Sequence, residues 1–352
     1  MPSTALLKAS FEILHATRMT RALAPWTRGL GLIFCLHRVI PNGGKSEGFA
    51  PNHQLEISPA FLDAALSHIK ARGYRLLSMA DAVAELNAPT PQRQPFAVFT
   101  LDDGYRDNLV HAAPLFRKHQ IPYTIYVAPG LVEATCDLWW LALERMIASR
   151  EELAVGINGE NRLVKTKTDA EKHQAWDMLF PHAKNLPEHE QRQWIRNLAA
   201  TCNLDLAEQC RTLVMDWHEI RDIAKDKLCT IGAHTLNHFA LRRLPQTEAL
   251  REMKSSAEII ADKLQKPVRH FAYPYGDVAE AGPREFGLAI EAGFATAVVT
   301  RKGVLYPGHA AHLHALPRVM LSGRYQKIRY LDALLSGAPL ALLNRFRHLD
   351  VN

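Results

Sequence analysis

Cysteine pairs are missing from this sequence. Its five cysteines are scattered and no Cys-x-x-Cys pattern occurs; they are Cys35, Cys136, Cys202, Cys210 and Cys229. An odd number at irregular spacing argues against a disulfide framework and against a zinc site built from cysteines. Reduced thiols in a cytoplasmic protein are therefore expected.

Long apolar runs are missing as well. The run Gly31-Leu32-Ile33-Phe34-Cys35-Leu36 is far shorter than the about 20 residues that cross a bilayer. It is typical of a buried strand. The N-terminal residues also lack the continuous apolar core and the small-residue cleavage site of a signal peptide. These absences favour a cytoplasmic location over secretion.

Blocks of one charge sign are absent too. The 42 basic and 36 acidic residues give a formal net charge of +6. This excess is mild and lacks the long Lys/Arg runs of a nucleic-acid-binding arm, so we expect no nucleic-acid partner. Hydrophobic residues make up 47% of the chain, which is enough for a large core.

Short β-rich runs recur along the chain and are apolar throughout instead of alternating. They lie at residues 32–36, 96–101, 123–127, 228–232, 270–273, 295–300 and 316–321. Such runs indicate strands buried on both faces, as in a parallel sheet or barrel. Helical patterns lie between them at residues 58–72, 108–119 and 247–265. The alternation predicts an α/β fold, either a (β/α) barrel or a doubly wound sheet.

One segment interrupts this rhythm. About 90 residues separate the predicted strands near residues 125 and 230, and they contain five of the six tryptophans. A structureless loop of that length is uncommon, so a helical insertion is expected at residues 136–226. The predicted organisation is an N-terminal helical extension (1–30), a barrel (31–322) that carries the insertion, and an amphipathic C-terminal tail (323–352).

Two adjacent carboxylates follow the predicted strand at residues 96–101, in Thr100-Leu101-Asp102-Asp103-Gly104. In barrel enzymes the carboxyl ends of the strands point at the active site. Neighbouring residues at a strand end face different directions, so one carboxylate can bind a metal while the other acts as a base. The alternative is a polar turn, since Asp-Gly is a common turn pair.

A histidine pair, His234 and His238, follows the strand at residues 228–232. Residues four apart on one helical turn share a face, so both imidazoles can reach one ion. With 17 histidines in the chain about one such pair is expected by chance, and the position at a strand end carries more weight than the spacing. Two histidines and one aspartate leave positions open for water and substrate, as in a catalytic metal site.

A third motif, Phe271-Ala272-Tyr273-Pro274-Tyr275-Gly276, ends another apolar run in a rigid turn. It is either a plain βα loop or a source of a backbone N–H for a developing oxyanion. Together, and in this order, the three motifs resemble those of the NodB-homology polysaccharide deacetylases, carbohydrate esterase family 4. The resemblance covers roughly residues 31–321, and it implies a distorted (β/α) barrel.

The resemblance also implies roles for individual residues. Asp102 matches the family's catalytic base and Asp103 its metal-binding aspartate, while His234 and His238 match the two histidine ligands. The backbone N–H of Tyr275 matches the oxyanion donor. Zinc is the expected ion, although cobalt, nickel or manganese suit the same donors. The implied substrate is an acetylated glycan.

The sequence departs from the family pattern at three places. Ala272 stands where many members have an arginine that orients the base, and Arg269 lies three residues earlier. The family's Asp-rich fourth motif and its Leu-x-His fifth motif, the source of the general acid, are not matched. His314 and His37 are the candidates for that acid; either could instead be structural.

Substrate contacts and competing functions complete the expectations. Trp139, Trp140 and Pro274 are candidate substrate contacts, with core packing as the alternative for the tryptophans. An O-acetyl esterase, an amide hydrolase acting on lipid-linked sugars, and a non-catalytic glycan-binding relative are the competing functions. An intact set of base and ligands argues against the last of these.

The two ends of the chain are basic and rich in aliphatic residues. Residues 1–30 and 324–352 each carry a net charge of +3. They are expected either to form helices that close the barrel or to make a peripheral contact with an anionic membrane. In the second case each basic residue contributes about 1 kcal/mol, and the contact weakens with salt.

Overall fold

A single curled sheet organises the computed structural model, which describes residues 8, 12, 17, 19–44, 48–89, 94–157 and 159–351. Seven strands pair in the order β11-β10-β9-β6-β5-β1-β12, all parallel, and β4 pairs with β5. The strands are β1 (Gly31–Leu36), β4 (Arg75–Leu76), β5 (Phe96–Leu101), β6 (Tyr123–Val127), β9 (Cys229–Ala233), β10 (His270–Ala272), β11 (Thr296–Val298) and β12 (Val319–Met320).

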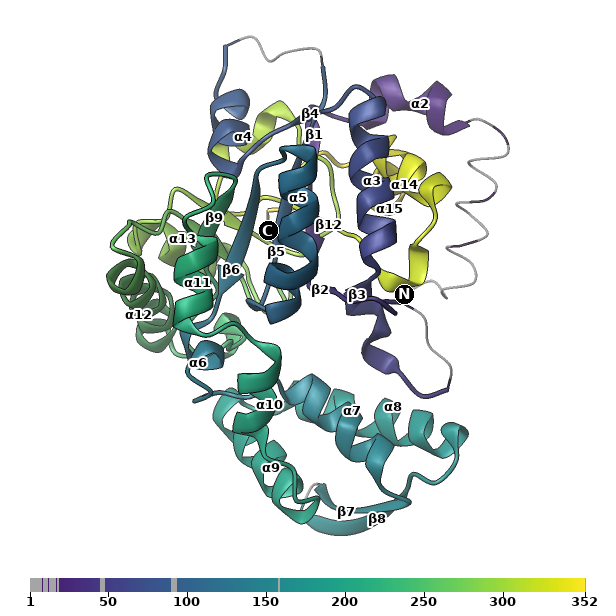
Figure 1. Ribbon diagram of the computed structural model, residues 1–352. Coiled ribbons are helices and arrows are strands. Elements are labelled where there is room, and N and C mark those ends of the chain that lie inside the picture. The colour runs from purple at the N-terminus through teal and green to yellow at the C-terminus, as the bar shows by residue number, and fades with distance from the viewer. Residues whose placement is uncertain are drawn as a thin grey trace.

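The sheet is buried on both faces, as the uninterrupted apolar runs predicted. Every residue of β1 and β5 is buried, and the two strands pair from Gly31 with Phe96 to Leu36 with Leu101. Each of the seven predicted runs overlaps one of these strands. The predicted distorted (β/α) barrel is therefore confirmed, as a curled half-barrel surrounded by helices (Figure 1).

Helices cover the sheet where the sequence predicted them. The helix expected at residues 58–72 begins after Ser58, whose side chain accepts a hydrogen bond from the Phe61 N–H, and Pro59 opens its first turn. The covering helices are α3 (Pro59–Ala71), α4 (Met79–Leu86), α5 (Ala113–His119), α6 (Pro129–Val132), α12 (Gln246–Leu264) and α13 (Pro283–Glu291), with a π-helical turn η2 (Asn108–Ala112) before α5.

The segment between β6 and β9 forms a second lobe with its own core, seen in teal and green below the barrel in Figure 1. It contains α7 (Trp139–Ser149), β7 (Glu152–Ile157), β8 (Glu160–Lys165), α8 (Asp169–Asn185), α9 (Glu188–Thr201) and α10 (Leu206–Leu213). The last helix before β9, α11 (Trp217–Ile223), instead packs Ile220 and Ile223 into the barrel core. The antiparallel β7–β8 hairpin was not predicted. Its signal is the alternating Leu153, Val155 and Ile157, which are buried while their neighbours are exposed.

The two ends of the chain meet beside the barrel. Helix α2 (Met19–Thr27) contacts α14 (Ile328–Leu335) and α15 (Ala338–Leu343), and the Thr27 hydroxyl donates to the Ser336 carbonyl at 2.6 Å. Most of residues 1–18, and so most of the predicted N-terminal extension, lie outside the described residues. Among the residues that are described, no helix is both long and apolar enough to cross a bilayer.

Short elements complete the chain. They are β2 (Arg38–Val39) and β3 (Glu56–Ile57), which pair in parallel, and the 3-10 turns η1 (Pro51–Leu55), η3 (Leu241–Arg243), η4 (Pro307–Ala311) and η5 (Gly323–Tyr325). All five cysteines are free, as expected from their spacing.

Candidate active site

The carboxyl ends of the central strands carry the polar residues that the sequence singled out. Asp102 and Asp103 follow β5, His234 follows β9, His37 follows β1 and Tyr275 lies beyond β10. Because these strands are parallel, their carboxyl ends meet at one edge of the sheet. All five residues line one cavity of about 310 Å³ between that edge and the insertion.

Asp103, His234 and His238 converge into one buried cluster. The distances from Asp103 Oδ1 to the Nε2 atoms of His234 and His238 are 3.5 and 3.2 Å. One ligand atom from each residue lies within 4.8 Å of the others. Two ligands of a tetrahedral zinc ion, at about 2.0–2.1 Å from it, are about 3.3 Å apart, so the spacing suits such an ion.

The histidine tautomers also suit a cation. Nδ1 of His234 lies 2.7 Å from the Ala272 carbonyl oxygen, which can only accept, so Nδ1 carries the proton and Nε2 presents a lone pair to Asp103. Burial lowers the pKa of His238 to about 4, which keeps that ring neutral at neutral pH. Asp103 Oδ1 is buried without a hydrogen-bond partner among the described residues. Acceptor atoms that face one another in this way fit a metal ion.

Strained backbone concentrates at this edge of the sheet. Asp103, Thr235, His238 and Tyr275 have φ values of 70°, 59°, 55° and 61°, in the left-handed region that non-glycine residues rarely adopt. Such conformations cost on the order of 1–3 kcal/mol each and persist where the surroundings hold them. They are a recurrent feature of functional sites.

Asp102 is held by an arginine that the motifs did not reveal. Nη1 and Nη2 of Arg318 each donate to one carboxylate oxygen of Asp102 at 2.7 Å, and Nη1 also donates to the Thr100 hydroxyl. Both Asp102 and Arg318 are buried. Burial alone would raise the pKa of Asp102, but Arg318, helped by His234 and His37, outweighs burial and lowers that pKa, so the carboxylate is charged.

Arg318 thus makes the contact with Asp102 that the family pattern assigns to an arginine at the position of Ala272. Arg269, the nearest arginine to that motif, is exposed at the start of β10, at the opposite end of the strand from the cavity. Arg318 directly precedes β12, which is the strand next to β1. Its only signal in the sequence is an arginine at the start of a predicted strand.

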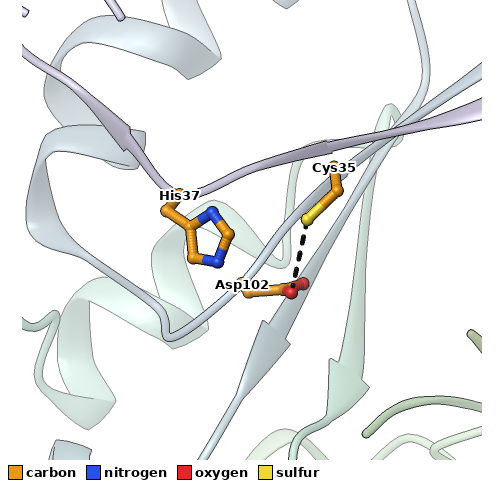
Figure 2. Close-up of side chains that lie close together, drawn as sticks. All are labelled: Cys35, His37 and Asp102. Atoms are coloured by element: carbon orange, nitrogen blue, oxygen red, sulfur yellow. Dashed lines mark hydrogen bonds between the residues drawn. The ribbon is translucent and has the colours of Figure 1, made fainter. Parts of the chain in front are cut away.

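Cys35 and His37 lie beside Asp102, and Figure 2 shows both side chains pointing toward its carboxylate. The Cys35 thiol is 3.6 Å from Asp102 Oδ2, and burial raises the pKa of this thiol well above its ordinary value. The three residues lie close enough to hold an ion. Because Arg318 already engages both oxygens of Asp102, we assign no metal to this second group.

The two candidates for the general acid occupy different places. His37 lines the cavity, and its Nδ1 atom is buried without a hydrogen-bond partner among the described residues. His314 does not line the cavity, and its Nε2 atom lies 2.7 Å from the Phe294 carbonyl oxygen. Of these two histidines, the structure thus brings only His37 together with Asp102.

The tryptophans of the insertion form one wall of the cavity. Trp139 is fully buried and its Nε1–H donates to the Tyr275 hydroxyl at 2.7 Å. Trp140 packs against His238 with ring centroids 4.9 Å apart. Both line the cavity, whereas Pro274 does not. The Tyr275 carbonyl accepts a hydrogen bond from the Thr300 hydroxyl, which fixes the turn after β10.

A parallel half-barrel with an anchored carboxylate beside a carboxylate–imidazole cluster is the arrangement of a barrel hydrolase. The family model "polysaccharide deacetylase" matches residues 90–285, more than half of the chain, and the chain belongs to that family. This confirms the resemblance drawn from the three motifs. The chain is therefore a carbohydrate deacetylase, a hydrolase that removes acetyl groups.

Solved structures show the same fold at low identity. The Streptococcus pyogenes deacetylase PplD in complex with acetate is 15% identical, with a TM-score of 0.55 over 86% of this chain and 97% of its own. IcaB from Ammonifex degensii is 17% identical, with a TM-score of 0.55 over 88% and 97%. A de-N-acetylase from Aggregatibacter actinomycetemcomitans is 13% identical, with a TM-score of 0.53 over 86% and 99%. Among curated proteins, no match was found.

Proposed function

We propose that this protein removes N-acetyl groups from an amino-sugar polysaccharide or oligosaccharide in a reaction that requires a divalent metal ion. The observation that carries the proposal is the convergence of Asp103, His234 and His238 beside Asp102 in one cavity. Two imidazoles and one carboxylate are donors that suit zinc, cobalt, nickel or manganese, and zinc is the ion we expect.

Asp102 is proposed as the base. A metal ion held by Asp103, His234 and His238 supplies Lewis-acid polarisation of the acetyl carbonyl and lowers the pKa of water. Asp102 Oδ2 accepts from both Arg318 and the Cys35 thiol, whereas Oδ1 accepts only from Arg318 among the described residues. Oδ1 therefore keeps a lone pair that can accept a proton from the attacking water. Arg318 fixes the direction in which that lone pair points.

Tyr275 is proposed to stabilise the oxyanion through its backbone N–H. Its left-handed conformation is held at two points, by Trp139 at the hydroxyl and by Thr300 at the carbonyl. A donor held in this way needs no reorganisation as negative charge develops on the substrate. Trp140 is proposed to contact the sugar as part of the cavity wall.

The metal requirement is tested by acetate release from a panel of N- and O-acetylated oligosaccharides. We expect N-acetylated substrates to release acetate, chelation to abolish the release, and added zinc to restore it, because three protein ligands hold one ion. The control is protein that is passed through the same chelation and then reloaded. Full activity in demetallated protein would refute the metal requirement.

The same panel separates the competing functions. Preferential release from O-acetylated members supports the esterase. When lipid-linked sugars are added to the panel, activity on these alone supports the amide hydrolase that acts on lipid-linked sugars. Saturable binding without release by the zinc-loaded protein supports a non-catalytic relative. A buried, paired base at the cavity argues against that last outcome, since a binding protein has no use for it.

His37 is proposed as the general acid. Replacing His37 with glutamine is expected to lower kcat for amide substrates about 10²–10⁴-fold, because the leaving amine then lacks a proton donor. The loss should be small for 4-nitrophenyl acetate, whose leaving group needs no proton. Both are measured by steady-state kinetics on zinc-loaded protein.

His314→Gln is the matched control for His37→Gln. Its side chain bonds a backbone carbonyl away from the cavity, so kcat should stay close to that of the wild type. Equal losses for amide and activated ester in His37→Gln would show that His37 supports the structure and is not the acid. A larger loss in His314→Gln would reverse the assignment.

The location of the protein stays a prediction. We propose a cytoplasmic protein with a peripheral contact to an anionic membrane. This contact is supported by exposed Leu342, Leu343 and Phe346 near exposed Arg345 and Arg347. Mixed apolar and basic side chains suit the surface of such a membrane. Sedimentation with anionic vesicles at low and high salt tests the contact, which should weaken with salt.

A further inference from the structure

Helix α9 of the insertion places the buried guanidinium of Arg192 against the loop that follows β9 (residues 234–238) and carries His238. Nη2 of Arg192 donates to the carbonyl oxygens of Asn237 and His238 at 3.2 and 3.1 Å. The side chain is almost fully buried. One turn later, Arg196 donates instead to the Asp137 carboxylate and the Thr135 carbonyl.

The loop needs such support because its backbone is strained. Thr235 and His238 both have left-handed φ values, which non-glycine residues keep only when their surroundings hold them. On the other side of the loop, the Glu252 carboxylate accepts hydrogen bonds from the backbone and side-chain N–H groups of Asn237 at 2.8 and 2.7 Å. Arg192 supplies donors and Glu252 supplies acceptors, so together they clamp the peptide units at positions 237 and 238.

The two histidines of the cluster are oriented in different ways. His234 is fixed through its ring, whose Nδ1–H reaches the Ala272 carbonyl. Nδ1 of His238 is buried without a hydrogen-bond partner among the described residues. The His238 ring is instead packed by Trp140 and Tyr275, with ring centroids 4.9 and 5.0 Å away. The direction of the His238 ring therefore depends on the His238 backbone and on packing against the ring. The insertion contributes to both, because Arg192 binds the backbone and Trp140 packs against the ring.

We infer that the insertion is a positioning element for the metal site, and that Arg192 is the residue through which it fixes the backbone of His238. This inference rests on the metal site of the proposed function. A ligand whose ring lacks a hydrogen-bonded partner must be held from behind for its Nε2 atom to point at the ion. Arg192 does this from helix α9 of the insertion, outside the strands of the barrel.

Charge alone predicts the opposite effect. A buried guanidinium repels a cation, so removal of Arg192 should strengthen metal binding if its charge were its main influence. Glu188, one turn earlier on α9, is also buried and offsets part of that charge. The sign of the change in metal affinity thus separates positioning from electrostatics.

The experiment titrates metal-free protein with Co²⁺ and Zn²⁺ in three variants. Arg192→Met removes the donors and is expected to weaken binding of both ions about 10–100-fold and to alter the Co²⁺ absorption spectrum. Arg192→Lys keeps the charge but is a point donor, and should lie between Arg192→Met and the wild type. Arg196→Met, the matched control on the same helix, should leave affinity and spectrum unchanged.

The outcomes also separate this inference from the proposed function. Wild-type protein that binds neither ion refutes the metal site itself. Wild-type binding with unchanged or tighter binding in both Arg192 variants refutes only the positioning role, as does an equal loss in Arg196→Met. At saturating metal the Arg192 variants should recover kcat with an unchanged KM, since Arg192 does not line the cavity. If Arg192→Met shows no cooperative thermal transition, it is not folded and its metal affinity is not interpretable. The metal affinity of Arg192→Lys, which conserves the buried charge, then tests the positioning role.

Discussion

Asp102→Asn is expected to lower kcat about 10²–10⁴-fold while the protein keeps its metal. The amide cannot accept the proton of the attacking water. The expected loss matches the rate enhancement that a positioned base typically contributes. The proposed ligands are Asp103, His234 and His238, and Asp102 is paired with Arg318 instead, so the ion should stay bound. Metal content is measured by elemental analysis after dialysis, and kcat by acetate release.

Asp103→Asn is the matched comparison, since the two aspartates are adjacent and equally buried. Removing one of three ligands should lower both metal content and activity. Equal loss of metal from the two variants would show that base and ligand have been misassigned. In Asp102→Asn the new asparagine faces Arg318. Thermal unfolding of both variants shows how much of the lost activity comes from destabilisation at this contact.

The architecture was largely readable from local sequence. Strands buried on both faces leave uninterrupted apolar runs, and helix starts leave signals such as the Ser58–Pro59 pair, so both could be located. The β7–β8 hairpin was missed because Leu153, Val155 and Ile157 alternate over only six residues within a mostly helical segment. Short alternating runs are easily lost among longer helical patterns.

The site was readable only where its residues share a motif. Asp102 with Asp103, and His234 with His238, are neighbours in sequence, so their chemistry could be inferred together. Arg318 lies 216 residues from Asp102, and no local pattern joins them. Choosing between His37 and His314 likewise needed three-dimensional positions, because both are histidines near strand ends.

Arg318→Met is expected to lower the free energy of unfolding by about 3–5 kcal/mol and to reduce activity strongly. The variant leaves Asp102 buried without its partner, and an unpaired buried charge is costly. Unfolding is measured on chelated protein, so that loss of metal does not contribute. Arg301→Met is the control: Arg301 is also buried and donates to the Ala281 carbonyl, but it does not contact Asp102.

The pH dependence distinguishes lost anchoring from general damage. In the wild type the pKa of Asp102 is lowered, so its stabilising effect is present above its unfolded pKa and is lost as pH falls through the folded value. Without Arg318, burial loses its strongest opposing influence and is expected to raise that pKa, so the base takes up a proton at higher pH. The acid limb of kcat/KM should therefore move to higher pH in Arg318→Met but not in Arg301→Met, and the stability gap to the wild type should widen as pH rises. An unmoved acid limb in an active Arg318→Met protein would show that Arg318 does not set the pKa of Asp102. A merely structural arginine would lower activity at every pH alike.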